Sequence, residues 1–464
     1  MQKHFSLSRC WLLLPAVAII FFLTACGAPE PTTTAPPATV PTAQILRSPV
    51  PVGPLNLVVP TPLTDTLALA PTQGAAGTTV PTVVGQPAAL PMTTPLPTLP
   101  APRDGPGGLP YPLALTKLNF GVVGHLYYTD RQTAMAKARE SGATWFRQQI
   151  HWRDIEDRSG AYFWGELDTI VADVNAAGML LMINVTRSPT WYTANGSDGL
   201  PEDPATLARF TGALAERYRG RVQAILIWNE QNLAYENGGS IGPEDPGQFV
   251  ELMAASYNAI KAADPSMIVV AGAPASTATN SPGIAMDTLS YLRAMYSYKG
   301  GMIRDYFDVQ ALHPGGSANP PETLYPAEPS SAQGWTDDPS FYFRHIENQH
   351  RVMEEAGMGD HQVWITEYGW ATANSTPGYE FGNQISFETQ RDYIVGAIQY
   401  TFNHYPWVSN MFLWNLNFTV LQRESGGNAQ NEQGSFSLVN ADWSPRPAFY
   451  GMQQAIAEIR SVQP

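Results

Sequence analysis

Two glutamates, Glu230 and Glu367, follow apolar stretches of the sequence and are the residues best suited to acid–base or nucleophilic chemistry. The stretch 224–230 is an apolar, β-branched run that ends in Asn229 and Glu230, and the stretch 362–368 leads into Glu367 in the same way. Both patterns indicate a buried strand with a carboxylate where the strand emerges. Two such carboxyl groups can serve as proton donor and nucleophile in the hydrolysis of a glycosidic bond. We therefore expect the two glutamates to face each other across a sugar.

The composition argues against a nucleic-acid partner and against a disulfide framework. The chain of 464 residues has a net charge of −14, whereas nucleic-acid binding needs clustered Lys and Arg. Its two cysteines are Cys10 and Cys26, and Cys10 lies in a segment expected to be removed, so no pair remains to form a bridge. Trp, Tyr and Phe are concentrated after residue 111, which favours an uncharged, ring-shaped ligand such as a sugar.

The N-terminal part differs in composition from the rest of the chain. Residues 1–25 combine two basic residues with an apolar run at 11–23, which is shorter than the ~20 residues of a spanning helix and is typical of a secretory signal peptide. Residues 26–110 are rich in Pro, Thr and Ala. Such a segment buries too little apolar surface to offset the entropy of folding, so it predicts a disordered linker.

The end of this signal resembles the lipobox of bacterial lipoproteins, because the sequence LTACG surrounds Cys26. The resemblance implies that cleavage before Cys26 makes it the lipidated N-terminus of the mature protein. An ordinary signal peptide that happens to contain a cysteine is the alternative. We expect an extracytoplasmic protein that is anchored to the cell membrane by lipid.

Beyond residue 111 short apolar stretches alternate with helix-like ones. The expected strands are 119–125, 144–150, 180–186, 224–230, 267–274, 307–314, 362–370 and 410–416. Apolar residues three and four positions apart predict helices that include 207–218, 249–262, 343–356 and 391–402, with a last helix at 448–460. Strands that alternate with helices are parallel, and eight such units close a (β/α)8 TIM barrel, here over residues 111–464. An open doubly wound sheet is the alternative.

The stretch 228–232, with the sequence WNEQN, is similar to the acid/base motif of family 39 and family 5 enzymes within the clan A glycoside hydrolases. The likeness covers most of residues 111–464. It implies that Glu230 is the acid/base, that Asn229 binds the 2-hydroxyl of the substrate and that Glu367 is the nucleophile of a retaining mechanism. Family 39 usually has proline at the position of Gln231, so this departure bears on the family rather than on the clan.

The same resemblance suggests roles for three residues on other strands. Arg147 corresponds to an arginine beside the nucleophile, where it would keep Glu367 ionised, and an arginine within an apolar strand is costly unless it is paired. His313 corresponds to a polar ring that supports the nucleophile or the sugar. Trp414 corresponds to a sugar platform under the subsite of cleavage. An ion pair on the rim, a buried structural histidine and core packing are the respective alternatives.

Asn184, Tyr368 and His125 are further candidates for the rim of the site, with roles in a loop or in the core as the alternative. The eight histidines of the chain are scattered and form no metal-binding motif. We therefore expect neither a metal nor another cofactor.

These observations predict a retaining β-glycosidase that cleaves a β-linked oligosaccharide or polysaccharide. The alternative is a carbohydrate-binding lipoprotein without catalysis, either a two-lobed solute receptor or an inactive barrel. A retaining mechanism requires carboxyl groups ~5–5.5 Å apart, and an inverting one ~6.5–9.5 Å. The identity of the sugar depends on the loops 192–204, 233–246 and 315–339.

Overall fold

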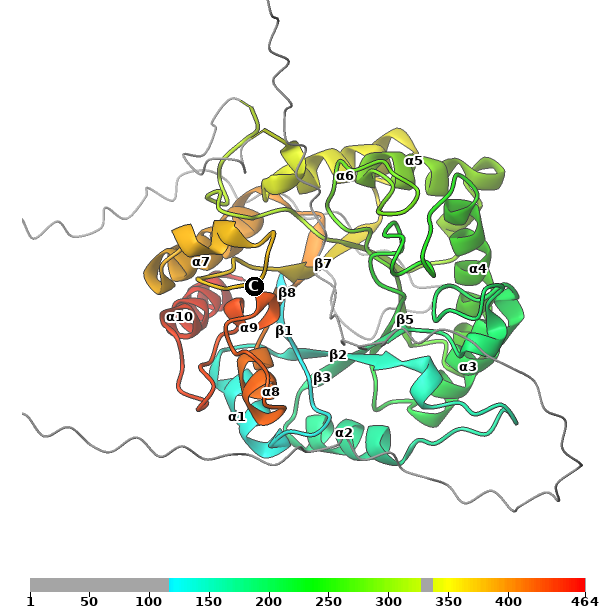
Figure 1. Cartoon of the computed structure of the whole chain (residues 1–464), viewed down its shortest axis with the longest axis horizontal. Coiled ribbons are helices and arrows are strands. Elements are labelled where there is room, and N and C mark those ends of the chain that lie inside the picture. The colour runs from blue at the N-terminus through cyan, green and yellow to red at the C-terminus, as the bar shows by residue number, and fades with distance from the viewer. Residues whose placement is uncertain (1–116, 327–336, 464) are drawn as a thin grey trace, which may run out of the picture. The chain divides into compact units, whose positions relative to one another are not determined.

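The computed structural model describes residues 117–326 and 337–463. The predicted signal peptide, the predicted linker and Cys26, the predicted lipidation site, lie outside the described residues. The described part forms a closed barrel of eight strands in the order β1-β2-β3-β4-β5-β6-β7-β8, with helices around it (Figure 1). All neighbouring strands are parallel, including β1 and β8 at the closure. The predicted (β/α)8 barrel is confirmed, and the open doubly wound sheet is wrong.

Each predicted strand segment overlaps one observed strand. The strands are β1 (Asn119–Gly124), β2 (Trp145–His151), β3 (Leu180–Thr186), β4 (Ala224–Ile227), β5 (Ile268–Ala271), β6 (Val309–Leu312), β7 (Gln362–Tyr368) and β8 (Val408–Trp414). The strand boundary that matters most for the site is the end of β4, because this strand ends at Ile227, before Glu230. The backbone that carries Glu230 is therefore a loop and not a strand.

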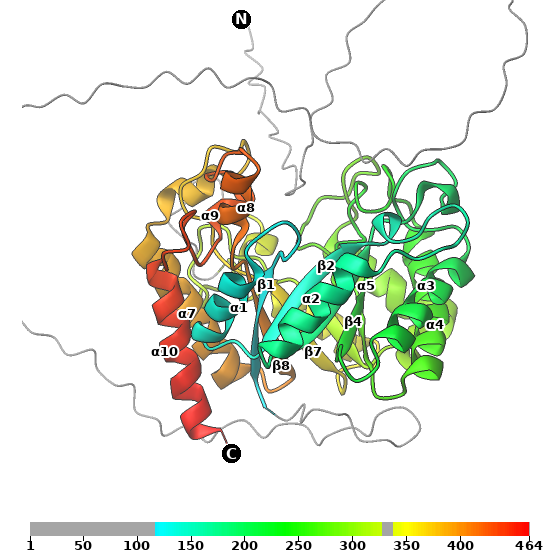
Figure 2. The same cartoon turned by 90° about the horizontal axis from the view of Figure 1, so that it is seen from below.

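Helices follow the strands and cover the outside of the barrel. They are α1 (Arg131–Glu140), α2 (Gly165–Ala176), α3 (Pro204–Arg217), α4 (Asp245–Ala263), α5 (Thr288–Ser297), α6 (His345–Glu355), α7 (Phe387–His404) and α10 (Pro447–Val462). Two short helices, α8 (Phe418–Glu424) and α9 (Glu432–Ser435), lie between β8 and α10. Figure 2 shows α8 and α9 at the upper end of the barrel and the C-terminus at the lower end. None of the helices in the described part of the chain is both long and apolar enough to cross a membrane.

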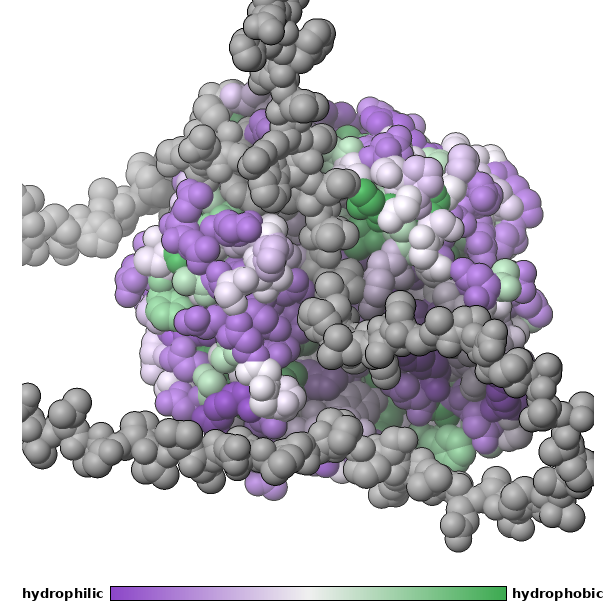
Figure 3. All heavy atoms as spheres, in the orientation of Figure 1, coloured by the Kyte–Doolittle hydropathy of each residue, from purple (hydrophilic) through white to green (hydrophobic). Residues whose placement is uncertain are grey.

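The core has two layers because successive side chains of a strand point to opposite faces of the sheet. The inner layer fills the barrel and centres on Trp145, Trp364 and Phe412, whose rings lie 5.0 to 6.2 Å apart. Gly121 on β1 leaves room for this layer, since a Cβ atom there would lie 2.4 Å from the ring of Phe412. The outer layer packs the strands against the helices. On the face seen in Figure 3, hydrophilic residues predominate and hydrophobic ones form small patches.

Candidate active site

The loop after β4 aims Glu230 by means of an unusual backbone. Trp228 and Glu230 have positive φ angles of 66° and 50°, a backbone conformation that is costly for residues other than glycine. The N–H of Trp228 donates to the carbonyl of Val185 at 2.9 Å, and the N–H of Glu230 donates to the carbonyl of Ala273 at 2.8 Å. Bonds to the chain on both sides of β4 thus hold the strained loop in place.

Glu367 lies on β7 and is paired with a buried arginine from β2. Nη1 of Arg147 is 2.5 Å from Oε1 of Glu367, and the same nitrogen donates to the carbonyl of Thr366 at 3.1 Å. Arg147 is fully buried, whereas the side chain of Glu367 is 17% exposed. The guanidinium therefore fixes a charged carboxylate at the mouth of the barrel.

The other end of the Arg147 guanidinium orients two amides. Nη2 donates to Oδ1 of Asn184 at 2.7 Å and to Oδ1 of Asn229 at 2.8 Å. Nδ2 of Asn184 in turn donates to the carbonyl of Trp228 at 2.8 Å. The amide nitrogen of Asn229 makes no hydrogen bond with any residue that the structure describes, so it remains available to donate to a ligand.

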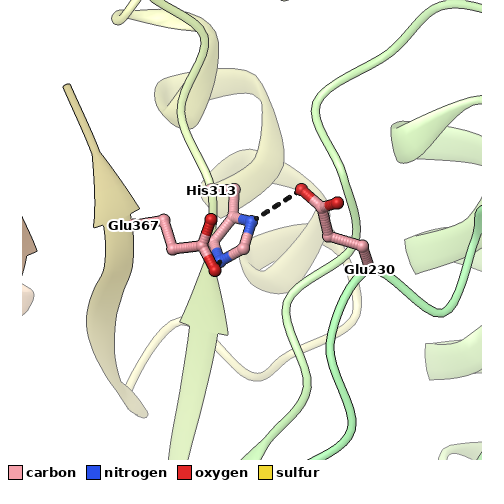
Figure 4. Close-up of side chains that lie close together, drawn as sticks. All are labelled: Glu230, His313 and Glu367. Carbon is pink, nitrogen blue, oxygen red and sulfur yellow. Dashed lines mark hydrogen bonds and ion pairs between the residues drawn. The ribbon is translucent and has the colours of Figure 1, made fainter. Parts of the chain in front are cut away.

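His313, which follows β6, lies between the two glutamates. Figure 4 shows its ring between Glu230 and Glu367, with the three side chains pointing toward one another. Nδ1 lies 3.1 Å from Oε1 of Glu230, and Nε2 lies 3.0 Å from Oγ1 of Thr366 and 3.9 Å from Oε1 of Glu367. The histidine is buried and connects the two carboxyl groups through its opposite ring nitrogens.

One ligand-type atom from each of Glu230, His313 and Glu367 lies within 4.8 Å of the others, a grouping that could hold a metal ion. Oε1 of Glu367 already contacts Nη1 of Arg147 at 2.5 Å. A fixed positive charge on that oxygen opposes a bound cation. We infer that the arrangement suits proton transfer and nucleophilic attack better than metal binding.

The structure places the side chain of Trp414 on the inner side of the barrel at the end of β8, whereas the side chain of Tyr368 lies in the outer layer. Trp414 ends β8, beside Val123 of β1, and its half-buried ring packs on the inner core of the barrel. Tyr368 follows Glu367 on the same strand, so its side chain points outward. It is buried in the outer layer, where its ring lies 6.5 Å from that of Phe343. The predicted contact of Tyr368 with a substrate has no support in this position.

Gln231, the departure from the family 39 motif, has a structural position. Its Nε2 donates to the carbonyl of Gly272 at 2.8 Å, and its side chain is fully buried. Asn232 is buried as well and exchanges hydrogen bonds with the backbone of Ala275. Both residues connect the loop after β4 to the loop after β5, and so they hold the segment that carries Glu230.

The charges of the site act on two further glutamates, Glu236 and Glu432, which the sequence patterns did not single out. Glu236 receives a hydrogen bond from Nη2 of Arg187 at 2.8 Å. Burial raises the pKa of Glu236 to about 8, with smaller contributions from the negative charges of Glu230 and Glu367. Burial also raises the pKa of Glu432, on α9, to about 7, and the charge of Glu230 adds to this shift. Their burial depends on the fold, and a local sequence pattern does not reveal it.

Comparison with known proteins places this site in a family. The model of "Cellulase (glycosyl hydrolase family 5)" matches residues 112–412. Among curated proteins, none matches the sequence significantly.

Similar solved structures include three glycoside hydrolases. A family 39 glycoside hydrolase from the gut symbiont Bacteroides cellulosilyticus is 18% identical with a TM-score of 0.52, and the match covers 74% of this chain and 64% of that one. A family 5 glycoside hydrolase from Streptomyces cattleya, in complex with GlcNAc, is 15% identical with a TM-score of 0.53 over 76% and 82% of the two chains. A glucosidase from Croceicoccus marinus is 13% identical with a TM-score of 0.52 over 74% and 68%.

These structural likenesses show the fold, and the family model shows the family. The predicted resemblance to clan A glycoside hydrolases is confirmed, since the matched model covers more than half of the chain and includes both Glu230 and Glu367. The chain therefore belongs to the cellulase family, glycosyl hydrolase family 5, and is a glycoside hydrolase.

Proposed function

We propose that the protein is a retaining β-glycosidase that cleaves a β-linked oligosaccharide or polysaccharide by double displacement. The observation that carries this proposal is the separation of the two carboxyl groups. A carboxylate oxygen of Glu230 and one of Glu367 lie within 4.8 Å of each other. This spacing is close to the ~5–5.5 Å of retaining enzymes and well below the ~6.5–9.5 Å that leaves room for a water in inverting ones.

In the first step Glu367 attacks the anomeric carbon while Glu230 protonates the departing oxygen. The bond from the anomeric carbon to that oxygen breaks, and an ester forms between the sugar and Glu367. Arg147 supports this role because its guanidinium pairs with the carboxyl group of Glu367 at 2.5 Å. The free amide of Asn229 can donate to a hydroxyl of the sugar, and Arg147 fixes its orientation.

In the second step a water molecule replaces the first product, and Glu230 takes its proton as the water attacks the anomeric carbon of the glycosyl ester. Glu367 leaves with the electron pair of the ester bond, so the sugar regains its original anomeric configuration. His313 contacts Glu230 at 3.1 Å and steadies its carboxyl group through both changes of protonation state.

The test uses two variants, sodium azide and an aryl β-glycoside with a good leaving group. In Glu367→Gly the azide takes the place of the missing carboxylate and attacks once, which yields an α-glycosyl azide. In Glu230→Ala the ester forms first and azide then displaces it, which yields a β-glycosyl azide. Without azide we expect both variants to lose at least roughly a thousand-fold in turnover.

The anomeric configuration of the azide product, determined by NMR, shows which glutamate is the nucleophile and which is the acid/base. A β-glycosyl azide from Glu367→Gly and an α-glycosyl azide from Glu230→Ala would mean that the two glutamates have the opposite roles. Full activity of both variants without azide would contradict the mechanism. A two-lobed solute receptor is not supported, because the described chain is a closed barrel.

The proposal includes a location and a partner. The lipobox-like sequence at Cys26 and the Pro/Thr/Ala-rich stretch after it support an enzyme that is anchored by lipid on the outer side of the cell membrane. A glycan outside the cytoplasm would then be its substrate.

A further inference from the structure

Arg187 lies directly after β3 and is buried beside the loop that carries Glu230. Its side chain is only 7% exposed, although burial of a charge is costly unless the charge is paired. Its φ angle of 58° is positive, as are those of Trp228 and Glu230 in the neighbouring loop. Backbone strain of this kind persists only where the surrounding structure imposes it, and it gathers at functional sites. The double displacement described above gives this arginine no role.

The guanidinium of Arg187 binds the far end of the loop after β4. Nη2 donates to Oε1 of Glu236 at 2.8 Å, and Nη1 donates to the carbonyl of Tyr235 at 3.3 Å. The central carbon of the guanidinium also lies 4.1 Å from the centroid of the Tyr235 ring, within the range of a cation–π contact. One side chain therefore holds a carboxylate, a backbone carbonyl and an aromatic ring of this loop.

The segment that Arg187 holds is bonded back to the start of the same loop. Nε1 of the fully buried Trp228 donates to the carbonyl of Glu236 at 3.1 Å. Within the loop, the N–H of Leu233 donates to the carbonyl of Glu230 at 2.9 Å. Glu230 thus lies inside a closed loop, residues 228–236, which we call the acid/base loop, and Arg187 holds its far end.

Ion pairs connect Arg187 to two further loops. Nη1 of Arg187 lies 3.4 Å from Oδ1 of Asp198 in the loop after β3. Asp198 also pairs with Arg153, which follows β2, and the N–H of Arg153 donates to the carbonyl of Arg187 at 2.9 Å. A Cβ atom on Gly199 would lie 2.4 Å from the backbone of Gly238, so the loops after β3 and β4 are in close contact. A shift of Arg187 would therefore be felt in the acid/base loop.

Arg187 also offsets the negative charge of Glu236 close to the catalytic carboxyl groups. Burial raises the pKa of Glu236 to about 8, and the charge of Arg187 opposes this shift. The negative charges of Glu230, Asp198 and Glu367 add to it. Without Arg187, an ionised Glu236 would face these carboxylates without its cation, and the loop would have to move to bring the charge into water.

We propose that Arg187 is a positioning residue for the acid/base Glu230, because it holds Tyr235 and Glu236 at the far end of the acid/base loop. The proposal rests on the glycosidase function proposed above and deepens it. Arg187 acts through this loop, whereas Arg147 holds the nucleophile separately. Loss of Arg187 should therefore impair protonation of the leaving group more than nucleophilic attack.

The test compares two leaving groups, because only one of them needs an acid. Dinitrophenolate departs as a stable anion, whereas phenolate departs slowly unless Glu230 protonates it. The substrates are phenyl and 2,4-dinitrophenyl β-glycosides in glucose, xylose and mannose series. In Arg187→Met we expect kcat/KM to fall about 10²-fold for the phenyl glycoside and less than about three-fold for the dinitrophenyl glycoside, since a displacement of about 1 Å at the acid has a cost of this size.

Two further variants extend the range of the test. Glu230→Ala removes the acid and should lower the ratio of kcat/KM for the phenyl glycoside to kcat/KM for the dinitrophenyl glycoside by about 10²- to 10⁴-fold. Arg187→Lys keeps a positive charge beside Glu236, which favours folding, but loses the fork of donors. It should lower the same ratio about ten-fold.

Arg209→Met is the matched control, because Arg209 pairs at 2.9 Å with Glu156, a buried carboxylate in the loop after β2. This variant also leaves a buried carboxylate without its arginine, but the carboxylate does not belong to the acid/base loop. Its ratio of kcat/KM for the two leaving groups should equal that of the wild type.

Hydrogen exchange, measured by mass spectrometry, gives a readout that does not depend on catalysis. Residues 228–239 should exchange faster in Arg187→Met than in the wild type, and not in Arg209→Met. Wild-type enzyme that hydrolyses none of the glycosides, together with this faster exchange, would sink the proposed function and leave the positioning of the loop standing. Active enzyme in which Arg187→Met and Arg187→Lys keep the wild-type ratio for the two leaving groups would overturn the role of Arg187 and leave the function standing.

Discussion

Arg147 is the residue on which the geometry of the site depends most, through its guanidinium group. It contacts Glu367, Asn184 and Asn229 at once from a fully buried position. Arginine can do this because its planar group presents several donors in fixed directions, whereas lysine is a single point of charge. A change here alters the orientation of three side chains and not merely one ion pair.

We predict that Arg147→Lys lowers kcat/KM about 10²- to 10³-fold, because lysine keeps the charge beside Glu367 but leaves Asn184 or Asn229 unoriented. The measurement is steady-state hydrolysis of an aryl β-glycoside, with the melting temperature recorded for the same samples. Arg147→Met, which removes the charge as well, should be less active than Arg147→Lys. Wild-type activity of Arg147→Lys would show that the fork geometry is unimportant, and equal activities of the two variants would show that the charge is unimportant.

The buried carboxyl group of Glu432 should make the stability of the protein depend on pH. Burial raises its pKa from about 4.5 to about 7, so between these values the folded protein retains a proton that the unfolded chain has lost. The free energy of unfolding then falls as pH rises from about 4.5 to about 7. Glu432→Gln removes this loss and should stabilise the protein by up to about 3 kcal/mol above pH 7, and much less at pH 4.5.

Urea unfolding at pH 5 and pH 8 measures this difference. Glu424→Gln, at an exposed position on α8, controls for the loss of one negative charge. A stabilisation by Glu432→Gln that is the same at both pH values would contradict the assignment, since neutralisation of a buried group acts only where the group would ionise.

Some residues of the site could be predicted from the sequence, and others could not. Glu230 and Glu367 could be singled out because polar groups at the ends of apolar strands are conspicuous, and the resemblance to clan A glycoside hydrolases pointed to Arg147 and His313. The outward position of Tyr368 also follows from the sequence once the alternation of a strand is applied to its neighbour Glu367. The raised pKa of Glu432 could not be predicted, because it depends on burial and on a charge two hundred residues away in the chain.

At the scale of secondary structure, the closure between β1 and β8 depends on a contact between a glycine and an aromatic ring. Gly121 pairs with Phe412 across this seam, and a Cβ atom on Gly121 would lie 2.4 Å from the ring. The ring cannot move freely because it packs against Trp145 and Trp364 inside the barrel. A larger residue at this position would therefore overpack the closure.

We predict that Gly121→Ala destabilises the protein by about 1–3 kcal/mol through overpacking. Adding Phe412→Leu should recover part of this loss, which a double-mutant cycle of urea unfolding would measure. Gly165→Ala is the control, since nothing lies within 4 Å of a Cβ atom there. If the effects of Gly121→Ala and Phe412→Leu on the free energy of unfolding simply add, the overpacking does not lie between these two residues.

The strands were easier to predict from the sequence than the segments that follow them. Short apolar runs mark most of the strands, because a parallel strand in a barrel is buried on both faces. The early end of β4 was not predicted, since it results from the positive φ angles at Trp228 and Glu230, which non-glycine residues rarely adopt. Hydrogen bonds from neighbouring strands impose that conformation, and local sequence does not reveal it.

At the scale of the whole molecule, the chain combines a catalytic barrel with a long N-terminal region of different composition. All residues assigned to catalysis lie between 147 and 367, within the part of the chain that the structure describes. The Pro/Thr/Ala-rich region contributes no residue to the proposed chemistry. Its proposed task is to hold the enzyme at the membrane, and this task can be separated from catalysis by mutation.

We predict that Cys26→Ala releases the protein from the membrane without changing kcat/KM on a soluble aryl β-glycoside. The reason is that acyl chains, which we expect at Cys26, would supply the membrane affinity, at ~0.8 kcal/mol per buried CH₂ group, while the barrel would supply the catalysis. The measurement combines membrane fractionation with metabolic labelling by an alkyne fatty acid in a bacterial host. Cys10→Ala, which changes the cysteine in the segment expected to be removed, should keep both the label and the membrane association. If the Cys26→Ala protein still carries the label, the lipid is attached to another residue.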